Sequence, residues 1–587
     1  MLSSDTLAEL QLLPCPELAM TITFVQPPLP TADLEKRRHQ IYPVLGEADL
    51  RLTQRFGIAH DFADGAVLIQ AGKQPPGMMV VLEGALALYR HDGFDNTARI
   101  ATLCPGQFSG EVGQLSNRPA MYDAKAEGAL KILLLTSESL RALLVAHADL
   151  GERLIRALIL RTVALLSHNS GGPVLIGPQG HGRIHALQSF LAANAHPCTV
   201  LDPLVDARAA ALVDLHRPGP DDWPLVLCPG AGIKKNPTMP ELGRCIGMLR
   251  DLSEDTLWDV IVVGGGPAGL AAAVYASSEG LSVLVLETRA YGGQAGASAR
   301  IENYLGFPTG ISGGALTGRA FVQAEKFGVE IAIPAPAGRL DCASHPVRVE
   351  MCGSLTLLKA RTVVLSCGAR YRRPPLANLK QFEGRGVYYW ASAVEAQLCK
   401  GQDIILVGGG NSAGQAAVFM AGHARKVHML IRRGGLEATM SRYLIERIEA
   451  HPNIVLHTYS EIVALEGGED GLKQVRVRNL QNDDEADFDI CRVFLFIGAD
   501  PNTGWLASSR VALDKHGFIR TGIAVAPGAG MDELPAPLAL QTSVPGVFAI
   551  GDVRSGSTKR VAAAVGEGAA VVAQIHEFLA ATAVSGR

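Results

Sequence analysis

Residues 259–287 read DVIVVGGGPAGLAAAVYASSEGLSVLVLE, and this stretch decides the fold of the second half of the chain. The apolar run from Asp259 to Val263 predicts a buried parallel strand. The Ala-rich residues 267–279 predict a helix, and the apolar run 282–286 predicts a second strand. The stretch therefore predicts a strand–turn–helix–strand unit of a parallel α/β sheet.

Three glycines of the turn, Gly264, Gly266 and Gly269, follow the spacing G-x-G-x-x-G. The first permits a tight turn, the second lets the backbone approach a pyrophosphate, and the third lets the helix pack on the strand. The pyrophosphate would lie on free N–H groups at the helix start, and Glu287 would accept hydrogen bonds from a ribose hydroxyl. The alternative is a glycine-rich turn in another α/β unit, but the flanking strands, helix and acid favour dinucleotide binding.

The chain continues with GGQAGASARIENYLGFP at residues 292–308. Together with the glycine motif, this sequence resembles the thioredoxin reductase branch of the FAD-dependent pyridine nucleotide–disulfide oxidoreductases. In that family the GGQ and the later Asn contact the flavin. The resemblance implies FAD as a cofactor, and it implies contacts from Gly264, Gly266, Pro267, Ala268, Gly269, Glu287, Gly292, Gly293, Gln294 and Asn303.

The length, charge and cysteine content of the chain limit the classes of protein to which it can belong. A chain of 587 residues has room for roughly three or four domains. Its formal net charge is −4, so we expect no broad basic surface that would bind nucleic acid or anionic membranes. No apolar run reaches the ~18 residues of a membrane span, and the N-terminus lacks the pattern of a signal peptide, with Met20 as an alternative start. We expect a cytoplasmic protein whose ten scattered cysteines are free thiols, since no two form C-x-x-C.

Segment 20–168 has the pattern of a small all-β domain, a barrel or jelly roll, flanked by helices. Residues 34–56 and 137–168 predict the helices. The predicted strands, separated by glycine turns, are residues 66–70, 78–82, 85–90, 98–103 and 130–135. The stretches LEGALALYR and PGQFSGEVGQLSNRPAMYDAKAE resemble the cyclic nucleotide-binding domain family.

In the cyclic nucleotide-binding family a Gly-Glu pair opens a short helix, its Glu binds the ribose 2′-OH, and an Arg pairs with the cyclic phosphate. The resemblance places Gly110 and Glu111 at the Gly-Glu positions, as effector-site residues, but puts Ala120 where the family has its phosphate Arg. Alanine cannot supply that charge-assisted contact, and Arg118 starts from a different point of the loop. We expect weak or absent binding of cyclic nucleotides, and the alternative role of the barrel is dimerisation or docking between domains.

Residues 172–250 show the order β-α-β-α-β…α. The segments PVLIG, CTVLD and PLVLC predict strands, and residues 183–194, 206–215 and 239–250 predict helices. With the Trp223-Pro224 step before the third strand, where cis bonds are common, this order resembles a thioredoxin-like fold.

The thioredoxin-like family has a C-x-x-C where its first helix opens, but here that place reads Gly177-Pro178-Gln179-Gly180. The dithiol needed for thiol–disulfide exchange is therefore missing. We interpret Cys198 and Cys228 as buried structural cysteines. The module is predicted to be an interaction or spacer domain.

The redox dithiol of thioredoxin reductases is also missing. In that family a C-x-x-C after GRGV takes electrons from the flavin, and the matching stretch here is GRGVYYWASAVEAQ. Trp390 and Ala393 stand at the two cysteine positions, and Val394 stands where the family has an acid. No thiolate can attack a disulfide from this place. We expect no catalytic residue here, and nearby Cys399 has no partner.

A second nucleotide motif, DIILVGGGNSAGQAAVFMAGHARKVHMLIRR, occupies residues 403–433. Arg432 and Arg433 end its second strand in place of an acid, which favours a 2′-phosphate and therefore NADPH over NADH. Against this, Glu437 stands where the family has a further Arg, and the alternative is that both arginines form only a solvated edge. The predicted turn and helix-start residues are Gly408, Gly410, Asn411, Ser412 and Ala413, the last replacing the third glycine.

The sequence TSVPGVFAIGDVRSGSTKRVAAAVGEGAAVVAQI, residues 542–575, resembles the second FAD signature of the family. The resemblance implies that Gly551 and Asp552 lie at the flavin, with Asp552 on the ribityl chain. A helix that starts near Arg560 would point its N-terminal dipole at the flavin N1/O2 edge. The family's Arg-Gln-Ala is Arg560, Val561 and Ala562 here, so one side-chain contact is lost.

We thus predict a multidomain chain with a cyclic nucleotide-binding-like domain at 20–168 and a thioredoxin-like α/β module at 172–250. Two Rossmann-type domains follow, one for FAD at 256–372 and 502–587 and one for NAD(P)H at 373–501. The resemblance implies hydride transfer from NADPH to flavin in a homodimer, without a metal.

Three hypotheses stay open for the second half of the reaction. The first is a reductase of a non-disulfide acceptor such as a quinone, a redox protein or oxygen. The second is a thioredoxin reductase with an unrecognised thiol arrangement. The third is a signalling flavoprotein whose reduced state is read by the N-terminal modules.

Overall fold

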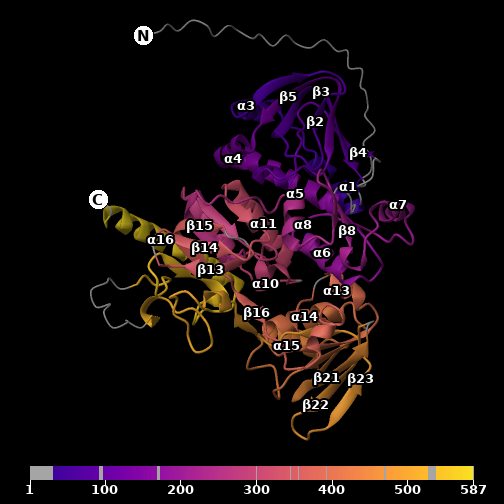
Figure 1. Cartoon of the computed structure of the whole chain (residues 1–587), viewed down its shortest axis with the longest axis vertical. Coiled ribbons are helices and arrows are strands. Elements are labelled where there is room, and N and C mark those ends of the chain that lie inside the picture. The colour runs from indigo at the N-terminus through magenta and orange to yellow at the C-terminus, as the bar shows by residue number, and fades with distance from the viewer. Residues whose placement is uncertain are drawn as a thin grey trace.

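The computed structural model divides the chain into an N-terminal barrel, a small α/β module and two nucleotide-binding parts (Figure 1). Residues 1–28, which include Met20 and the first residues of the predicted barrel, lie outside the described residues, as does Ser392. The structure describes residues 29, 31–91, 97–167, 172–298, 300–343, 345–353, 356–391, 393–468, 471–525 and 537–585.

The N-terminal domain is built on a five-stranded antiparallel sheet of order β1-β5-β3-β4, with β2 paired to β5. The strands are β1 (Ile58–Phe62), β2 (Val67–Ile69), β3 (Met78–His91), β4 (Thr97–Leu103) and β5 (Asp123–Leu135). The short helix η1 (Val112–Ser116) lies between β4 and β5. The flanking helices are α1 (Ala32–Lys36), α2 (Arg38–Ile41), α3 (Glu47–Gln54), α4 (Ser137–Ala146) and α5 (Ala148–Ser167).

Three strands of this domain differ from the prediction. β5 begins at Asp123, whereas the predicted strand began at residue 130. β3 is one continuous strand where the sequence predicted two, because Gly84, at φ +82°, lies in a bulge that shifts the register without ending the pairing. β1 was missed because most of its residues are exposed and show no alternation of burial.

The middle module is a four-stranded sheet of order β7-β6-β8-β9, in which β6 and β7 are parallel and the other pairs antiparallel. The predicted strands and helices are present, and the Trp223-Pro224 bond is cis. β9, a short and partly polar strand, was not predicted, and α8 ends five residues before its predicted end. The elements are β6 (Val174–Ile176), α6 (Gly182–Ala193), β7 (Thr199–Leu201), α7 (Ala207–His216), β8 (Leu225–Cys228), β9 (Gly232–Lys235) and α8 (Met239–Cys245).

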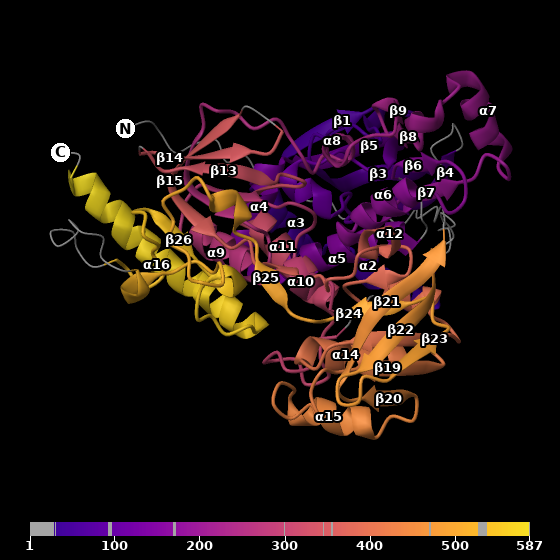
Figure 2. The ribbon, with the colours of Figure 1, turned by 60° about the horizontal axis from the view of Figure 1, so that its bottom comes forward.

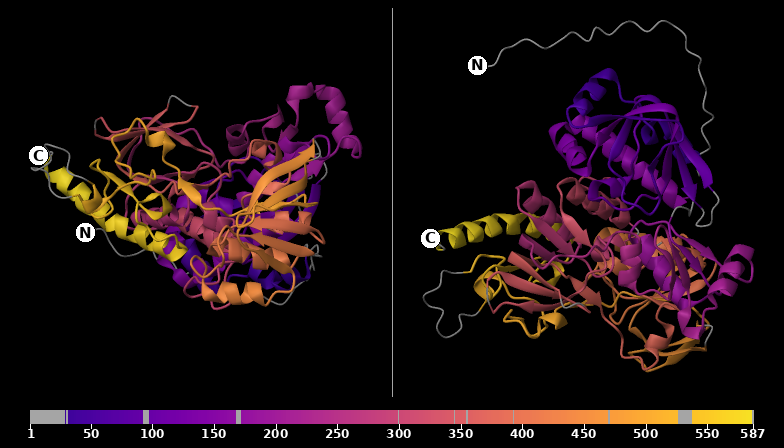
Figure 3. Two further views of the ribbon diagram at one scale, coloured as in Figure 1. Left: turned by 90° about the horizontal axis from the view of Figure 1, so that it is seen from below. Right: turned by 45° about the horizontal axis from the view of Figure 1, so that its top comes forward.

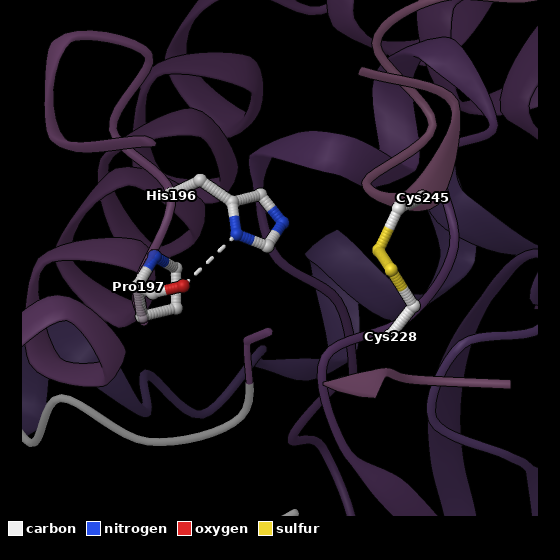
Figure 4. The surroundings of a disulfide bond; sticks show 4 residues. All are labelled: His196, Pro197, Cys228 and Cys245. Carbon is white, nitrogen blue, oxygen red and sulfur yellow. Dashed lines mark hydrogen bonds between the residues drawn. A yellow bond between two sulfur atoms is a disulfide. The ribbon is translucent and has the colours of Figure 1, made fainter. Parts of the chain in front are cut away.

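The expectation that all cysteines are free thiols is wrong for Cys228 and Cys245, which form a disulfide (Figure 4). Their Cα atoms lie 5.8 Å apart because the end of β8 and the end of α8 meet over the module core. The two residues are 17 positions apart in sequence, so no short motif marks the pair. Cys228 is buried, as predicted, whereas Cys198 is partly exposed and free.

The FAD-binding part contains a seven-stranded sheet of order β12-β11-β10-β15-β14-β13, with β26 paired to β15. β10, β11, β12, β15 and β26 are parallel. Side chains of β10 alternate between two cores, and the core that holds Val260 and Val262 is covered by α9 and α16. The elements are β10 (Leu257–Val263), α9 (Pro267–Ser278), β11 (Val283–Leu286), α10 (Gly293–Gly296), α11 (Gly313–Lys326), β12 (Glu330–Ala332), β13 (Ala337–Asp341), β14 (Val347–Met351), β15 (Leu357–Leu365), β26 (Val547–Ala549) and α16 (Val561–Ser585).

The NADPH-binding part contains a parallel sheet of order β17-β24-β18-β19-β20 and an antiparallel sheet of β21, β22 and β23. The chain enters and leaves through the paired strands β16 (Ala369–Tyr371) and β25 (Ala499–Pro501). The antiparallel strands and α16 lie on opposite sides of the molecule (Figure 2). The other elements are α12 (Leu379–Phe382), β17 (Val387–Tyr388), α13 (Ala393–Leu398), β18 (Asp403–Val407), α14 (Asn411–Ala421), β19 (Lys426–Leu430), α15 (Arg442–Glu449), β20 (Ile454–His457), β21 (Ser460–Gly468), β22 (Gly471–Asn479), β23 (Glu485–Phe488) and β24 (Val493–Leu495).

The barrel and the module both pack against the FAD-binding part, and Figure 3 shows the barrel as a lobe beside it. Val322 of α11 belongs to the apolar core of the barrel. Phe321, Ile333 and Tyr291 belong to the apolar core of the module. The N-terminal half of the chain therefore shares its cores with the FAD-binding part.

A buried ion pair joins the barrel to α11. Arg118, in the loop after η1, pairs with Glu325, and its guanidinium lies 5.1 Å from the centre of the Phe321 ring. The two charged side chains are 15% and 2% exposed. Arg250, just after the module, donates a hydrogen bond to the carbonyl of Ser116 in η1. These contacts support docking between domains as a role of the barrel.

Arg118→Met should destabilise the protein by about 3–5 kcal/mol, because it leaves the Glu325 carboxylate buried without a partner. The double variant Arg118→Met/Glu325→Leu should recover most of that loss, since an apolar pair removes the charge altogether. The measurement is urea unfolding followed by circular dichroism. An exposed pair, Arg442 with Glu446 on α15, provides the control, and Arg442→Met should cost no more than ~0.5 kcal/mol. An Arg118→Met variant as stable as that control would contradict the prediction.

Candidate functional site

A cavity of about 360 Å³ lies where the FAD-binding and NADPH-binding parts meet. Its walls include the ends of both nucleotide motifs and the start of α16. The structure thus brings together residues from widely separated stretches of the sequence. The predicted residues on its wall are Gly264, Gly266, Pro267, Ala268, Glu287, Gly293, Gln294, Asn303, Asp552, Arg560, Val561, Asn411 and Ser412, together with Trp390.

The turn between β10 and α9 has the close backbone approach that its glycines predicted. A Cβ on Gly269 would lie 1.9 Å from the carbonyl oxygen of Gly264, so α9 can approach the strand only without a side chain there. Gly264, at φ +110°, would place a Cβ 2.4 Å from the Ser366 carbonyl oxygen. A Cβ on Gly266, by contrast, would meet no described atom within 4 Å, and Gly266 lines the cavity. This open cradle at a helix start fits a bound pyrophosphate.

Glu287 lies at the end of β11, directly beside the turn. Its Oε2 accepts a hydrogen bond of 2.7 Å from the N–H of Gly265, and its Oε1 accepts one of 2.9 Å from the N–H of Arg289. Burial raises the pKa of this carboxyl, while the backbone N–H donors act against that rise. Glu287 is thus fixed in position with its carboxylate on the cavity wall, as the binding of ribose hydroxyls requires.

The start of α16 forms another wall of the cavity. Asp552, Arg560 and Val561 line it, whereas Gly551 and Ala562 do not. Gly551 instead donates its N–H to Glu567 at 2.7 Å, which holds the short helix η5 (Gly551–Val553) against α16. Burial raises the pKa of Asp552. These features leave space and a helix N-terminus at the place implied for the flavin.

Lys559 also lines the cavity, and the sequence analysis did not single it out. Its ammonium donates a hydrogen bond to the carbonyl of Asp552 and lies 4.6 Å from the centre of the Phe518 ring. Burial lowers the pKa of Lys559, with the charge of Asp552 acting in the opposite direction. The sequence did carry a signal for this residue. Lys559 is a cation two residues before the helix that was predicted to point its N-terminal dipole at the flavin.

The second nucleotide motif contributes the start of α14. Asn411 and Ser412 line the cavity, and Asn411 accepts a hydrogen bond of 2.7 Å from the N–H of Ser441. Gly408, at φ +141°, would place a Cβ 2.4 Å from the Phe496 carbonyl oxygen, so this turn also requires glycine. Gly410 lies at the helix N-cap, and Ala413 is buried below it.

Arg432 and Arg433 follow β19 and are both exposed. Within the part of the chain that the structure describes, neither guanidinium forms an ion pair. They lie outside the wall of the cavity itself, at the carboxyl end of the sheet where the adenosine half of a dinucleotide would extend. This placement leaves both charges available to a 2′-phosphate.

Trp390 occupies the cavity wall where the family carries a redox cysteine. Its indole N–H donates a hydrogen bond of 3.0 Å to Glu395, which is 4% exposed. The guanidinium of Arg289 lies 4.6 Å from the centre of the indole ring. Arg289 comes from the FAD-binding part and Trp390 from the NADPH-binding part, so the stack joins the two. The sequence analysis missed Arg289 and Glu395, because the contact exists only after the two parts pack.

The segment that carries Arg289 is also held from the module. Asn194, at the end of α6, donates a hydrogen bond of 2.9 Å from its amide to the carbonyl oxygen of Arg289. Two residues further on, Tyr291 stacks on Phe321, with ring centroids 4.2 Å apart. The segment between Glu287 and Gly293 is therefore fixed by three different parts of the chain.

Two free thiols lie near this site. Cys367 lines the cavity, its Sγ donates to the carbonyl of Asn502 at 3.2 Å, and burial raises its pKa to about 12. Cys399 is fully buried in the apolar core that also holds Ala391, and burial raises its pKa to about 12. A thiol with such a pKa stays protonated near neutral pH and is a poor nucleophile.

A second cavity, of about 220 Å³, lies inside the barrel between the sheet and α5. Gly110 and Glu111 line it, as the resemblance implied, and burial raises the pKa of Glu111 to about 7. Ala120 is buried outside this wall, and Arg118 is turned away toward Glu325. Neither supplies a cation for a cyclic phosphate.

The backbone donors at the start of η1 are already used inside the barrel. The N–H of Gly110 donates to the Tyr122 hydroxyl at 2.8 Å, and the N–H of Val112 to Thr162 at 3.4 Å. The buried Arg161 of α5 donates to the Gly110 carbonyl at 3.1 Å. Tyr122 and Arg161 were missed because nothing in their local sequence marks them as cavity residues.

Comparison with known proteins identifies two families. Residues 258–568 match the model of the pyridine nucleotide-disulphide oxidoreductases, and residues 59–147 match that of the cyclic nucleotide-binding domain. The thioredoxin reductase of Mycolicibacterium smegmatis is 32% identical over 329 residues, which cover 56% of this chain and 98% of that protein. The NADPH-dependent thioredoxin reductase 3 of Arabidopsis thaliana is 31% identical over 329 residues, which cover 55% of this chain and only 58% of that protein.

Solved structures were also matched. A thioredoxin reductase of Lactococcus lactis is 25% identical, with a TM-score of 0.49, and the match covers 55% of this chain and 99% of that one. The structure contains no helix long and apolar enough to cross a membrane among the described residues. Because the first family model spans more than half of the chain, this protein belongs to the pyridine nucleotide-disulphide oxidoreductases and is an NAD(P)H-dependent flavoprotein oxidoreductase with FAD and NADPH as cofactors.

Proposed function

We propose that the protein passes a hydride from NADPH to FAD and then delivers electrons to an acceptor that is not a disulfide. The observation that supports this proposal is Trp390, which stands on the cavity wall at a redox cysteine position, held by Glu395 and Arg289. Cys367 on the cavity wall and the buried Cys399 both have a pKa raised to about 12 by burial. A disulfide acceptor needs an attacking thiolate, and neither thiol provides one.

The roles proposed for the site residues follow from their positions. FAD and NADPH, when bound, supply the redox chemistry itself. Glu287 would hold the ribose and the open turn at Gly266 the pyrophosphate of FAD, while Asp552 would hold the ribityl chain. Arg432 and Arg433 would pair with the 2′-phosphate of NADPH. The proposal needs no catalytic acid or base for the hydride step.

The Arg289–Trp390 stack would also restrict the acceptor. An indole hydrogen-bonded at one end and covered by a guanidinium is held in one orientation. It would act as a wall against bulky protein disulfides, while a planar quinone or dioxygen can reach the space beside it. A small acceptor is therefore favoured over a protein acceptor.

A second candidate function is a signalling flavoprotein, and the buried Arg118–Glu325 pair favours it. The pair connects the loop beside η1 to α11, and α11 packs beside the flavin-side residue Tyr291 through Phe321. A change in the barrel cavity would therefore reach the FAD-binding part through packed side chains. In this case the flavin would be reduced without rapid turnover.

The fold of the module, the domain boundaries, the oligomeric state and the location of the protein are further proposals. We infer a thioredoxin-like module, which the sheet order β7-β6-β8-β9 and the cis bond before β8 support. We infer domain boundaries near residues 372 and 502, which the β16–β25 pair supports. A homodimer remains a prediction from the resemblance, and a cytoplasmic location remains a prediction from the cysteine pattern and the N-terminal sequence.

The decisive experiment is an acceptor screen on purified FAD-bound protein supplied with NADPH. Quinones, dioxygen, small redox proteins and thioredoxin would be compared by the rate of NADPH oxidation. Fast turnover with a quinone or dioxygen supports the reductase, and fast turnover with thioredoxin overturns it. Flavin reduction without turnover on any acceptor favours the signalling role.

Arg432→Ala/Arg433→Ala should reduce the preference for NADPH over NADH, measured as the ratio of kcat/KM. Each charge-assisted contact to the 2′-phosphate contributes about 1.5–3 kcal/mol, which the double variant would lose. Arg442→Ala, an exposed arginine of α15, is the matched control and should keep the wild-type ratio. If the double variant also keeps that ratio, these arginines are not the phosphate ligands.

NADPH should bleach the flavin absorbance of the protein under anaerobic conditions, yet thioredoxin and a disulfide dye should give no release of thiolate. The reason is that no thiolate stands between the flavin and a disulfide substrate. Cys367→Ser and Cys399→Ser should behave like wild type in both measurements. Robust thioredoxin-dependent dye reduction that disappears in either variant would reveal a thiol route and refute the proposal.

Calorimetric titration with cyclic AMP should show weak binding or none, because Ala120 provides no cation and the Gly110 N–H is already bonded to Tyr122. Tyr122→Phe frees that N–H but adds no charge, so it should not create tight binding. Sub-micromolar affinity in the wild-type protein would contradict the prediction.

A further inference from the structure

The disulfide between Cys228 and Cys245 lies at the joint between the module, the barrel and the FAD-binding part. Both cysteines are buried, at 1% and 8% exposure, in the apolar core that includes Phe321 of α11. His196 lies nearby, with Nδ1 hydrogen-bonded to the Pro197 carbonyl (Figure 4). Burial lowers the pKa of His196 to about 4, so no charged imidazole stabilises a thiolate there.

The segment after Cys228 touches one loop of the barrel. Gly72, between β2 and β3, packs directly on the backbone of Pro229, and a Cβ on Gly72 would lie 2.4 Å from the Pro229 carbonyl carbon. A Cβ on Gly230 would lie 3.0 Å from the Gly72 carbonyl oxygen. The contact is thus backbone against backbone, with no flexible side chain that can adapt.

The segment after Cys245 touches a second loop of the barrel. Gly247 packs on Pro119, and a Cβ there would lie 2.1 Å from the Pro119 ring. The next residue, Met248, accepts a hydrogen bond of 3.0 Å from the N–H of Ile333 in the FAD-binding part. This short segment is therefore fixed on both sides.

The two barrel loops are bonded to each other. Gly72 donates its N–H to the Ala120 carbonyl at 2.8 Å, and Ala120 donates its N–H to the Lys73 carbonyl at 2.9 Å. The disulfide ties the two module segments, and these hydrogen bonds tie the two barrel loops that they touch. The result is a closed ring of contacts whose only covalent cross-link is the Cys228–Cys245 bond.

The ring lies next to both functional regions of the barrel. Its loop 118–120 carries Arg118, the partner of Glu325, and directly follows η1, which begins after the cavity residue Glu111. Any loosening of the ring would therefore affect both the interdomain ion pair and the segment that leads from the cavity residue Glu111 to Arg118.

The bond joins one pair of the described cysteines. Among the described residues, the seven cysteines outside this pair are free thiols. In the cytoplasmic location that the sequence predicts, a protein disulfide is typically catalytic or redox-sensing.

We propose that Cys228–Cys245 is a reversible thiol–disulfide site that a dithiol reductant opens, and that its state controls how firmly the barrel is held to the flavoprotein. The oxidised pair closes the ring and fixes loop 118–120. The reduced pair leaves the two module segments free to separate, so the loop and the Arg118–Glu325 contact become mobile.

The reaction is an ordinary exchange between a dithiol and a disulfide. A thiolate of the reductant attacks the sulfur of Cys245, the more exposed of the pair, and the bond to Cys228 breaks. The Cys228 sulfur leaves with the electron pair and takes up a proton. The second thiol of the reductant then displaces Cys245, which is also protonated, so the reductant ends as a disulfide and this protein gains two thiols.

The test uses full-length, FAD-bound protein before and after treatment with dithiothreitol. Alkylation and mass spectrometry should count two additional thiols after treatment, mapped to Cys228 and Cys245. Amide hydrogen exchange of residues 112–120 should become about tenfold faster, equivalent to ~1.4 kcal/mol of local opening, and should return to its first value after reoxidation. Exchange in β18 and β19 of the NADPH-binding part should not change.

Two variants separate the site from a general effect of the reductant. Cys228→Ser/Cys245→Ser should show the fast exchange without dithiothreitol, and Cys352→Ser, which removes an exposed free thiol, should behave like the oxidised wild type. If the double variant fails to fold, the wild-type comparison decides the question alone. Equal exchange of residues 112–120 in the oxidised and reduced states, or a pair that dithiothreitol cannot reduce in the folded protein, overturns the proposal.

Discussion

The turn between β10 and α9 can form because two stretches of backbone meet there with no side chain between them. The Gly264 carbonyl and Gly269 approach so closely that any Cβ on Gly269 would overlap the oxygen. This approach fixes the angle between strand and helix, and with it the open cradle at Gly266 and the position of Glu287. The cavity, the start of α16 and the second nucleotide motif are all arranged around that point.

The structure could be predicted from the sequence wherever a local sequence pattern determines it. The apolar runs around Val260 and Val283 predicted β10 and β11 to within two residues, because strands buried on both faces have no polar positions. The glycine spacing predicted a turn whose geometry leaves no room for side chains. In the barrel, by contrast, β1 was not predicted, because an exposed edge strand shows no alternation of buried and exposed residues.

The unpredicted features are those in which distant segments meet. The Arg289–Trp390 stack, the Cys228–Cys245 bond and the Arg118–Glu325 pair each join residues from different elements. No periodicity or motif records such a pair, because each partner alone is an ordinary residue of its own segment. The sequence did show which side chains were absent from the expected redox position, and the structure shows what stabilises the replacement.

The shared core of the module and the FAD-binding part has a consequence for how the domains of this chain can be exchanged in evolution. Tyr291, Phe321 and Ile333 are covered by residues of the first 250 positions, and Asn194 completes the hydrogen bonding of the Arg289 carbonyl. A flavoprotein cut at the start of β10 would expose this apolar surface to water and lose a fixed point beside the Glu287 carboxylate. The N-terminal half is thus a structural part of the oxidoreductase, and recombination that exchanged it for an unrelated domain would have to rebuild the flavoprotein's own interior.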